Sequence, residues 1–122
     1  MAVNKILIVD DDSRNIFALT AVLKAKGYKC MSATGGQEGL ELLEQDKEIT
    51  VVLMDMMMPG MDGYEAINRM SKHPSLKDIP VIAVTAQAMM GDRERCLSAG
   101  AVGYISKPIN VDELTRLLND YI

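Results

Sequence analysis

Five polar side chains in this sequence could do chemistry together: Asp10, Asp11, Asp55, Thr85 and Lys107. Carboxylates are hard oxygen ligands of the kind that Mg²⁺ prefers. A carboxylate can also accept a phosphoryl group in covalent catalysis. An ammonium and a hydroxyl can bind the oxygens of a transferred phosphoryl group. The residue types therefore indicate magnesium and phosphoryl chemistry.

Each of these polar positions closes a short apolar stretch. The stretches are residues 6–9, 51–54, 81–84 and 104–105. Buried parallel strands read as continuous apolar runs like these. In open α/β sheets, sites lie beyond the carboxyl ends of the strands. We therefore expect the polar side chains to meet in one cleft.

Strand-like and helix-like segments alternate along the chain. We expect strands at residues 5–9, 29–33, 51–55, 80–85 and 103–106, and helices at 13–26, 36–45, 64–71, 89–99 and 111–121. Strict alternation favours a parallel sheet with helices on both faces. The prediction is an α/β fold, a (βα)5 flavodoxin-like three-layer sandwich of strand order 2-1-3-4-5.

Size and composition narrow the classes of protein. The 122 residues fit one domain spanning 1–122, with 48% hydrophobic and 25% charged residues. No apolar run approaches the roughly 20 residues of a membrane span, and residues 1–5 do not resemble a secretory signal. A net charge of −4 without a basic cluster argues against direct nucleic-acid binding. Cys30 and Cys96 lack metal-ligand spacing, so we expect buried free thiols in a reducing cytoplasm.

Four motifs resemble those of the receiver domain of two-component response regulators. They are Asp10-Asp11, residues 54–63 (MDMMMPGMDG), residues 84–86 (VTA) and residues 104–108 (YISKP). Each motif alone is weak. All four in this order, at strand ends and over essentially the whole chain, make the resemblance specific.

The resemblance implies a phosphoacceptor and a metal site. Asp55 would be the phosphoacceptor. Asp11, Asp55 and the backbone carbonyl of Met57 would ligate Mg²⁺ directly, and Asp10 would act through water. No organic cofactor is implied.

The resemblance also implies a switch. Thr85 and Lys107 would bind the phosphoryl oxygens, and the Lys107-Pro108 peptide bond would be cis. When phosphoryl draws Thr85 inward, the ring of Tyr104 would turn inward and change the surface of the fourth helix, fifth strand and fifth helix. This is a packing element biased by a local charge.

The implied function is signalling: a partner's phosphohistidine would transfer phosphoryl to Asp55, and the altered surface would bind a downstream protein target. The donor, a histidine kinase or a histidine phosphotransfer domain, would dock near the first helix, including Ile16. The chain would catalyse only its own phosphorylation and dephosphorylation, as a monomer or a phosphorylation-dependent dimer. Met57 and Gln87 would tune the lifetime of the phosphorylated state. Asn15 and residues 86–89 resemble kinase-attached and relay receivers, which leaves a stand-alone regulator and a hybrid-kinase segment both open.

Three other functions compete with this one. A magnesium phosphohydrolase of the haloacid-dehalogenase type has a second Asp two residues after its nucleophile, where this chain has Met57, which cannot transfer protons. A flavodoxin-like cofactor binder is disfavoured by the acidic cleft and the lack of a glycine- and hydroxyl-rich phosphate loop. A degenerate receiver that acts only as an interaction module stays open.

Three polar residues have simpler interpretations. Asp12 has two possible roles, as a third acidic group of the cleft or as a cap of the first helix, and the sequence leaves both open. Asp62 is expected to be structural. His73, the single histidine, is expected in a solvent-exposed loop, which excludes a histidine-based triad.

Overall fold

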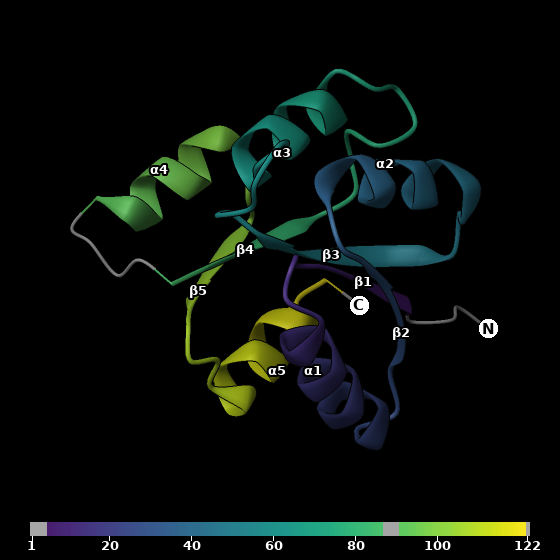
Figure 1. The fold of residues 1–122 in the computed structure, drawn as a ribbon, viewed down its shortest axis with the longest axis vertical. Coiled ribbons are helices and arrows are strands. Elements are labelled where there is room, and N and C mark those ends of the chain that lie inside the picture. The colour runs from purple at the N-terminus through teal and green to yellow at the C-terminus, as the bar shows by residue number, and fades with distance from the viewer. Residues whose placement is uncertain (1–4, 87–90, 122) are drawn as a thin grey trace.

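The computed structural model describes residues 5–86 and 91–121, in which strands and helices alternate (Figure 1). The strands are β1 (Lys5–Val9), β2 (Lys29–Ala33), β3 (Ile49–Asp55), β4 (Val81–Thr85) and β5 (Gly103–Ser106). The helices are α1 (Ser13–Ala25), α2 (Gly36–Gln45), α3 (Gly63–Ser71), α4 (Asp92–Ala99) and α5 (Val111–Asn119).

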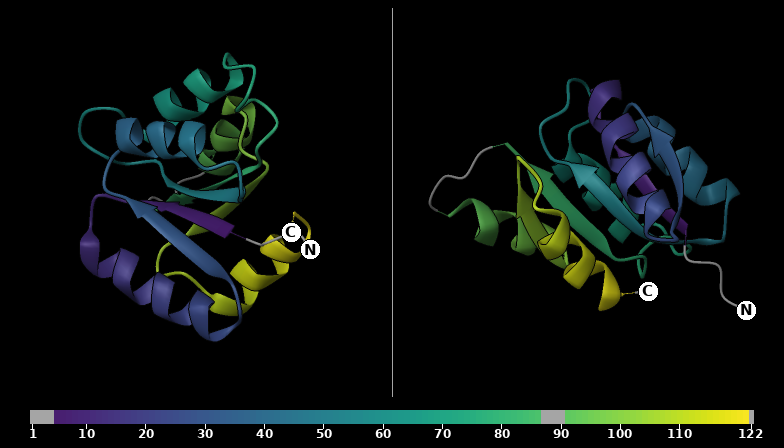
Figure 2. Two further views of the ribbon diagram at one scale, coloured as in Figure 1. Left: turned by 90° about the vertical axis from the view of Figure 1, so that its right-hand side faces the viewer. Right: turned by 90° about the horizontal axis from the view of Figure 1, so that it is seen from below.

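The strands form one parallel sheet of order β2-β1-β3-β4-β5, which confirms the predicted topology. Helices α2, α3 and α4 cover one face of the sheet, and α1 and α5 cover the other (Figure 1; Figure 2). The chain order reverses between β1 and β3, which pair side by side. A crevice for chemistry is expected at this point, beyond the carboxyl ends of the two strands.

The core lies on both faces of the sheet. On β1, Leu7 and Val9 belong to the cluster under α2, α3 and α4. Ile6 and Ile8 belong to the cluster under α1 and α5. All four are at most 1% exposed. The continuous apolar runs of the sequence therefore reflect burial on both faces.

Polar side chains begin three of the helices. An Asp12 carboxylate oxygen accepts a hydrogen bond from the Arg14 N–H at 2.9 Å, at the start of α1. Asp62 accepts from the Glu65 N–H at 2.9 Å, at the start of α3. Asn110 accepts from the Glu113 N–H at 3.0 Å, at the start of α5. Asp12 and Asp62 are thus N-caps, which satisfy backbone donors that lack a partner within the helix.

Most element boundaries fall within one or two residues of the prediction. β3 begins at Ile49, two residues early, and β4 begins after Pro80, which has no N–H to donate. Helix α4 begins at Asp92, after Gly91 at φ 88°, a left-handed conformation that favours glycine. The expected start at Met89 lies outside the described residues. No helix in the described part of the chain is long and apolar enough to cross a bilayer.

Two expectations about single residues need correction. Cys96 is a buried free thiol, as predicted, but Cys30 is only partly buried because β2 is an edge strand. His73 lies in a loop but is not fully exposed: its Nε2 lies 3.0 Å from Glu44 Oε1, and its Nδ1 accepts the Ser75 N–H. The loop after α3 packs back toward α2, which the local sequence does not reveal.

Candidate functional site

Three carboxylates meet at the carboxyl ends of β1 and β3. Val9 pairs with Met54 in the sheet, so the next residues, Asp10 and Asp55, lie side by side. Asp10 is 3% exposed and Asp55 is 4% exposed, whereas Asp11 is exposed. One carboxylate oxygen from each of the three lies within 4.8 Å of the others. The predicted acidic cleft is therefore formed.

The two buried carboxylates are held in the same way. Asp10 Oδ1 accepts the Asp12 N–H at 2.9 Å, and Asp55 Oδ1 accepts the Met57 N–H at 2.9 Å. Lys107 Nζ donates to the Oδ2 atoms of Asp10 and Asp55, at 3.3 Å from each. Each carboxylate thus has one oxygen oriented by the backbone and one facing the same ammonium.

Burial and charge act against each other in this cluster. Burial raises the pKa of Asp55, although the Met57 N–H and Lys107 favour its ionised form. Burial on its own would lower the pKa of Lys107, but the carboxylates of Asp55 and Asp10 outweigh it and raise that pKa. The cluster holds three carboxylates, and the Lys107 ammonium contacts two of them, so the ionised cluster carries excess negative charge that a divalent cation would offset.

Thr85 and Lys107 lie on neighbouring chain segments. Thr85 ends β4 and is 1% exposed. It pairs with Ser106 of β5, and the Lys107 N–H donates to the Thr85 carbonyl at 2.8 Å. The Lys107-Pro108 bond is cis, as expected. Tyr104 lies in β5, where it pairs with Ala83 and is partly buried.

The loop after Asp55 divides its methionines between core and surface. Met56 and Met58 are buried, whereas Met57 is 51% exposed. The backbone N–H of Met57 binds Asp55, so the backbone of Met57 adjoins the acidic cleft. Gln87, the other position expected to tune lifetime, lies outside the described residues.

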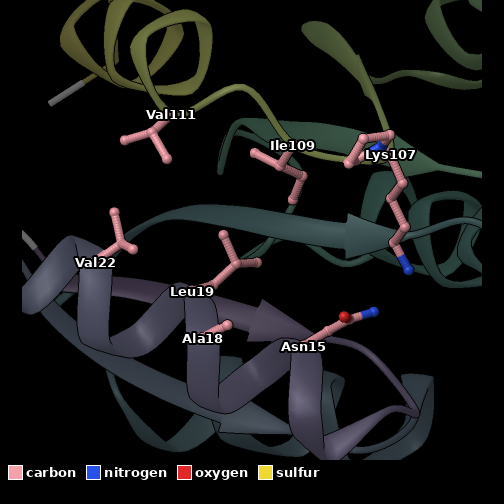
Figure 3. A pocket seen from close by; sticks show the side chains of 8 residues that line it. Asn15, Ala18, Leu19, Val22, Lys107, Ile109 and Val111 are labelled. Carbon is pink, nitrogen blue, oxygen red and sulfur yellow. The ribbon is translucent and has the colours of Figure 1, made fainter.

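A groove runs from the site between α1 and the segment after β5 (Figure 3). It is lined by Asn15, Ala18, Leu19, Val22, Lys107, Pro108, Ile109 and Val111, with a cavity volume of about 290 Å³. Asn15 and Lys107 lie at one end, and Val22 and Val111 lie at the other (Figure 3). Lys107 therefore belongs to both the acidic cleft and the groove.

Sequence reasoning missed one buried charge. Asp92, in the first turn of α4, is 7% exposed. An acid at this point of a helix reads as a solvated partner of the helix dipole. The only sequence signal was its spacing of four residues from Cys96, which places both on one helix face.

Comparison with known proteins decides the family. Residues 6–119 match the sequence profile of the response regulator receiver domain. The chain belongs to the response regulator receiver domain family. The receiver is 36% identical to the protein PilH of Pseudomonas aeruginosa over 115 residues, 94% of each chain. It is 35% identical to the polar-differentiation response regulator DivK of Brucella anthropi, over 96% of this chain and 94% of DivK.

Solved structures agree with this assignment. The receiver superposes on the receiver domain of a sensor histidine kinase from Pseudomonas aeruginosa PAO1 with a TM-score of 0.88 and 34% identity, over 98% of each chain. That structure has a magnesium ion coordinated in its active-site cleft. The resemblance, the fold and a place in two-component signalling are therefore confirmed.

Proposed function

We propose that the receiver accepts a phosphoryl group on Asp55 from the phosphohistidine of a partner protein, in a magnesium-dependent reaction. The observation that carries this proposal is the pair of buried carboxylates, Asp10 and Asp55, that share Lys107 at 3.3 Å from each. A buried carboxylate next to a cation and further carboxylates is arranged for phosphoryl chemistry rather than for stability.

The reaction moves one phosphoryl group. The P–N bond to the donor imidazole breaks, a P–O bond to the Asp55 carboxylate forms, and the leaving imidazole takes up a proton. Lys107 would then bind a phosphoryl oxygen in place of an Asp55 oxygen. Thr85, at the end of the adjacent strand, would donate a hydrogen bond from its hydroxyl to another phosphoryl oxygen. Hydrolysis would transfer the phosphoryl group to water, release inorganic phosphate and restore the Asp55 carboxylate, so no metabolite would be turned over and the domain would signal rather than act as a metabolic enzyme.

The donor set of the cleft fits Mg²⁺. Asp10, Asp11 and Asp55 offer carboxylate oxygens within 4.8 Å of one another, and hard oxygen ligands are what this ion prefers. Asp11 and Asp55 would ligate it directly with the Met57 carbonyl, and Asp10 would act through water. When bound, Mg²⁺ would neutralise charge on the phosphoryl oxygens.

The output would pass through Thr85 and Tyr104. Thr85 ends β4 and Tyr104 lies on β5, the neighbouring strand. Movement of Thr85 toward a phosphoryl group would let the Tyr104 ring turn inward, and the α4-β5-α5 surface would change for a downstream protein. A phosphorylation-dependent dimer would use the same face. Two free cysteines fit a reducing compartment, so the proposal places the receiver in the cytoplasm.

The donor would dock on the groove of Figure 3, with a helix of a histidine kinase or a histidine phosphotransfer domain as its occupant. Lys107 links the groove to Asp55, so a helix seated there would bring its phosphohistidine to the cleft. Phe17 on α1 does not line the groove, but it is 77% exposed and offers an apolar contact on the outer surface of the same helix. Ile16, expected at this surface, is partly buried and packs against the core. Phe17 is therefore the better docking probe.

Intact mass after incubation with acetyl phosphate and MgCl₂ tests the proposal. We expect one added phosphoryl group on the wild type and none on Asp55→Asn or with EDTA. Asp78→Asn, an exposed acid distant in sequence, is the matched control and should be modified like the wild type. Retained labelling of Asp55→Asn would contradict the proposal.

The same experiment separates the alternatives. Continuous release of phosphate from an added phosphomonoester would favour a phosphohydrolase, which Met57 disfavours because a thioether cannot transfer protons. Magnesium binding without labelling, both with acetyl phosphate and with phosphorylated donor proteins, would favour an interaction module.

A further inference from the structure

Asp92 is a buried carboxylate away from the proposed phosphorylation site. The buried polar or charged side chains among the described residues are Asp10, Asp55, Thr85 and Asp92. The first three lie at the site, and Asp92 lies in the first turn of α4. A buried carboxylate is costly unless hydrogen bonds compensate for its lost hydration. The identity of its partners therefore shows what this residue does.

Each oxygen of Asp92 faces a tyrosine from a different element. The Tyr104 hydroxyl of β5 donates to Oδ2 at 3.2 Å. The Tyr64 hydroxyl of α3 lies 3.5 Å from Oδ1. Asp92 thus joins α3, α4 and β5 through one carboxylate.

The surroundings reinforce this junction. The Tyr64 hydroxyl also lies 3.6 Å from the Cys96 Sγ, and the Arg95 guanidinium stands 4.3 Å from the centre of the Tyr64 ring. Burial raises the pKa of both phenols; the hydrogen bond to Cys96 adds to this for Tyr64, and the bond to Asp92 adds to it for Tyr104. Both phenols therefore remain protonated donors at neutral pH.

Both tyrosines lie on segments that lead away from the site. Tyr64 follows Gly63, whose N–H faces the Met56 carbonyl one residue after the phosphoacceptor. Tyr104 is three residues before Lys107 on the strand that pairs with β4. A displacement of either segment would move a tyrosine whose hydroxyl contacts the Asp92 carboxylate.

We infer that Asp92 is a positioning residue that holds the Tyr104 and Tyr64 rings in the orientation seen here and transmits their displacement to the first turn of α4. The inference rests on the proposed function, because phosphorylation of Asp55 supplies the displacement. Asp92→Asn keeps the shape of the side chain but replaces one acceptor oxygen with a donor amide. In the variant, one tyrosine hydroxyl can no longer donate to Asp92 and can bind only by accepting from the amide N–H, and no cavity is created.

The first test needs no phosphorylation. Protein labelled with 3-fluorotyrosine gives ¹⁹F resonances that single Tyr→Phe variants assign. Asp92→Asn should shift the Tyr64 and Tyr104 resonances and leave Tyr28 and Tyr121 unchanged, because these two bond to Asn119 and Val102. Unchanged Tyr64 and Tyr104 resonances would overturn the inference.

The second test measures coupling. Backbone amide shifts of residues 92–95 are compared before and after phosphorylation with acetyl phosphate. Asp92→Asn should still take up one phosphoryl group but reduce these shift changes at least threefold, and Tyr104→Phe should do the same. The double variant should reduce these shift changes no more than either single variant does, because both substitutions break the same link between Tyr104 and Asp92.

Controls separate coupling from mere folding. Asp112→Asn removes an exposed acid from the first turn of α5 and should leave the response of residues 92–95 intact. A full α4 response in phosphorylated Asp92→Asn, or additive losses with Tyr104→Phe, would overturn the inference while the proposed function stands. Failure of the wild type to take up phosphoryl would contradict the proposed function, and the fluorotyrosine test would still decide whether Asp92 orients the rings.

Discussion

Gly63 and Met56 approach each other so closely that no side chain fits between them. A Cβ on Gly63 would lie 2.7 Å from the Met56 Cα and 2.9 Å from the Asp55 carbonyl oxygen. Both neighbours are backbone atoms, which cannot swing aside. The start of α3 is therefore packed directly against the residue that follows Asp55.

Gly63→Ala should consequently destabilise the receiver by about 1–3 kcal/mol, the range for overpacking a dense interior. Urea unfolding measures this free energy. Gly35→Ala is the matched control, since an added Cβ there meets no heavy atom within 4 Å and its φ of −162° suits any residue. We expect Gly35→Ala to cost less than about 1 kcal/mol. Equal losses for the two variants would show that the close approach does not matter.

Neutralising Asp55 should stabilise the metal-free protein. Asp55→Asn keeps an oxygen for the Met57 N–H and leaves Lys107 paired with Asp10, while it removes a desolvated charge from the cluster. We expect a gain on the order of 1 kcal/mol in urea unfolding with EDTA. Added Mg²⁺ should stabilise the wild type more than the variant, because a ligand bound to the native state raises stability. The same magnesium response in both proteins would contradict this expectation.

Met57→Asn should shorten the life of the phosphorylated state. The Met57 backbone binds Asp55, and its exposed side chain carries only a weak hydrogen-bond acceptor, whereas an amide can orient an attacking water. We expect dephosphorylation to be about 3- to 10-fold faster, or about 0.7–1.4 kcal/mol in activation free energy. Loss of label after removal of the donor measures the rate. Met57→Leu should behave like the wild type, and an unchanged rate for Met57→Asn would refute the idea.

Phe17→Ser should weaken phosphotransfer from a histidine kinase that serves the wild type. Loss of an apolar anchor at an interface costs more than about 1 kcal/mol at the important positions, so we expect roughly a tenfold lower transfer rate at subsaturating receiver. Labelling by acetyl phosphate should not change, since Phe17 is remote from the chemistry. Val102→Ser, which alters an exposed apolar residue after α4, is the control. Equal transfer to Phe17→Ser and wild type would place the donor elsewhere.

The two thiols should react slowly and in a fixed order. Burial raises the pKa of Cys96 and of Cys30, so the reactive thiolate is a minor form of both at pH 8. Cys96 is also inaccessible, so iodoacetamide should modify Cys30 first. Mass spectrometry over time, with urea-unfolded protein and Cys30→Ser as controls, follows each site. Faster labelling of Cys96 would mean that α4 opens readily.

The strands and the acidic cleft were predictable because they follow from local patterns. A run such as residues 6–9 indicates burial on both faces, and parallel order then brings Asp10 beside Asp55. The sequence left Asp12 open between a helix cap and a third acidic group of the cleft, and it indicated only a structural role for Asp62; both are N-caps. The inferences about the strands and the cleft needed only neighbouring residues and the rules of parallel sheets.

Contacts between helices could not be read in the same way. Asp92 meets Tyr64, 28 residues earlier, only because α3 and α4 pack together. The sequence offered Ile16 as a docking position on the first helix, but Ile16 packs against the core while Phe17 is exposed. Such facts depend on the relative placement of elements, which local propensity does not encode.

The hydrogen bond between Lys107 and Asp10 spans 97 residues of sequence. The acidic residues are synthesised early, but the cation that faces them leaves the ribosome only after β5. A nascent chain that lacks β5, or a molecule in which β5 has detached, retains the carboxylates without their ammonium. Competence for the proposed reaction is therefore a property of the completed fold. A partly synthesised or partly unfolded molecule would not accept phosphoryl and would not signal.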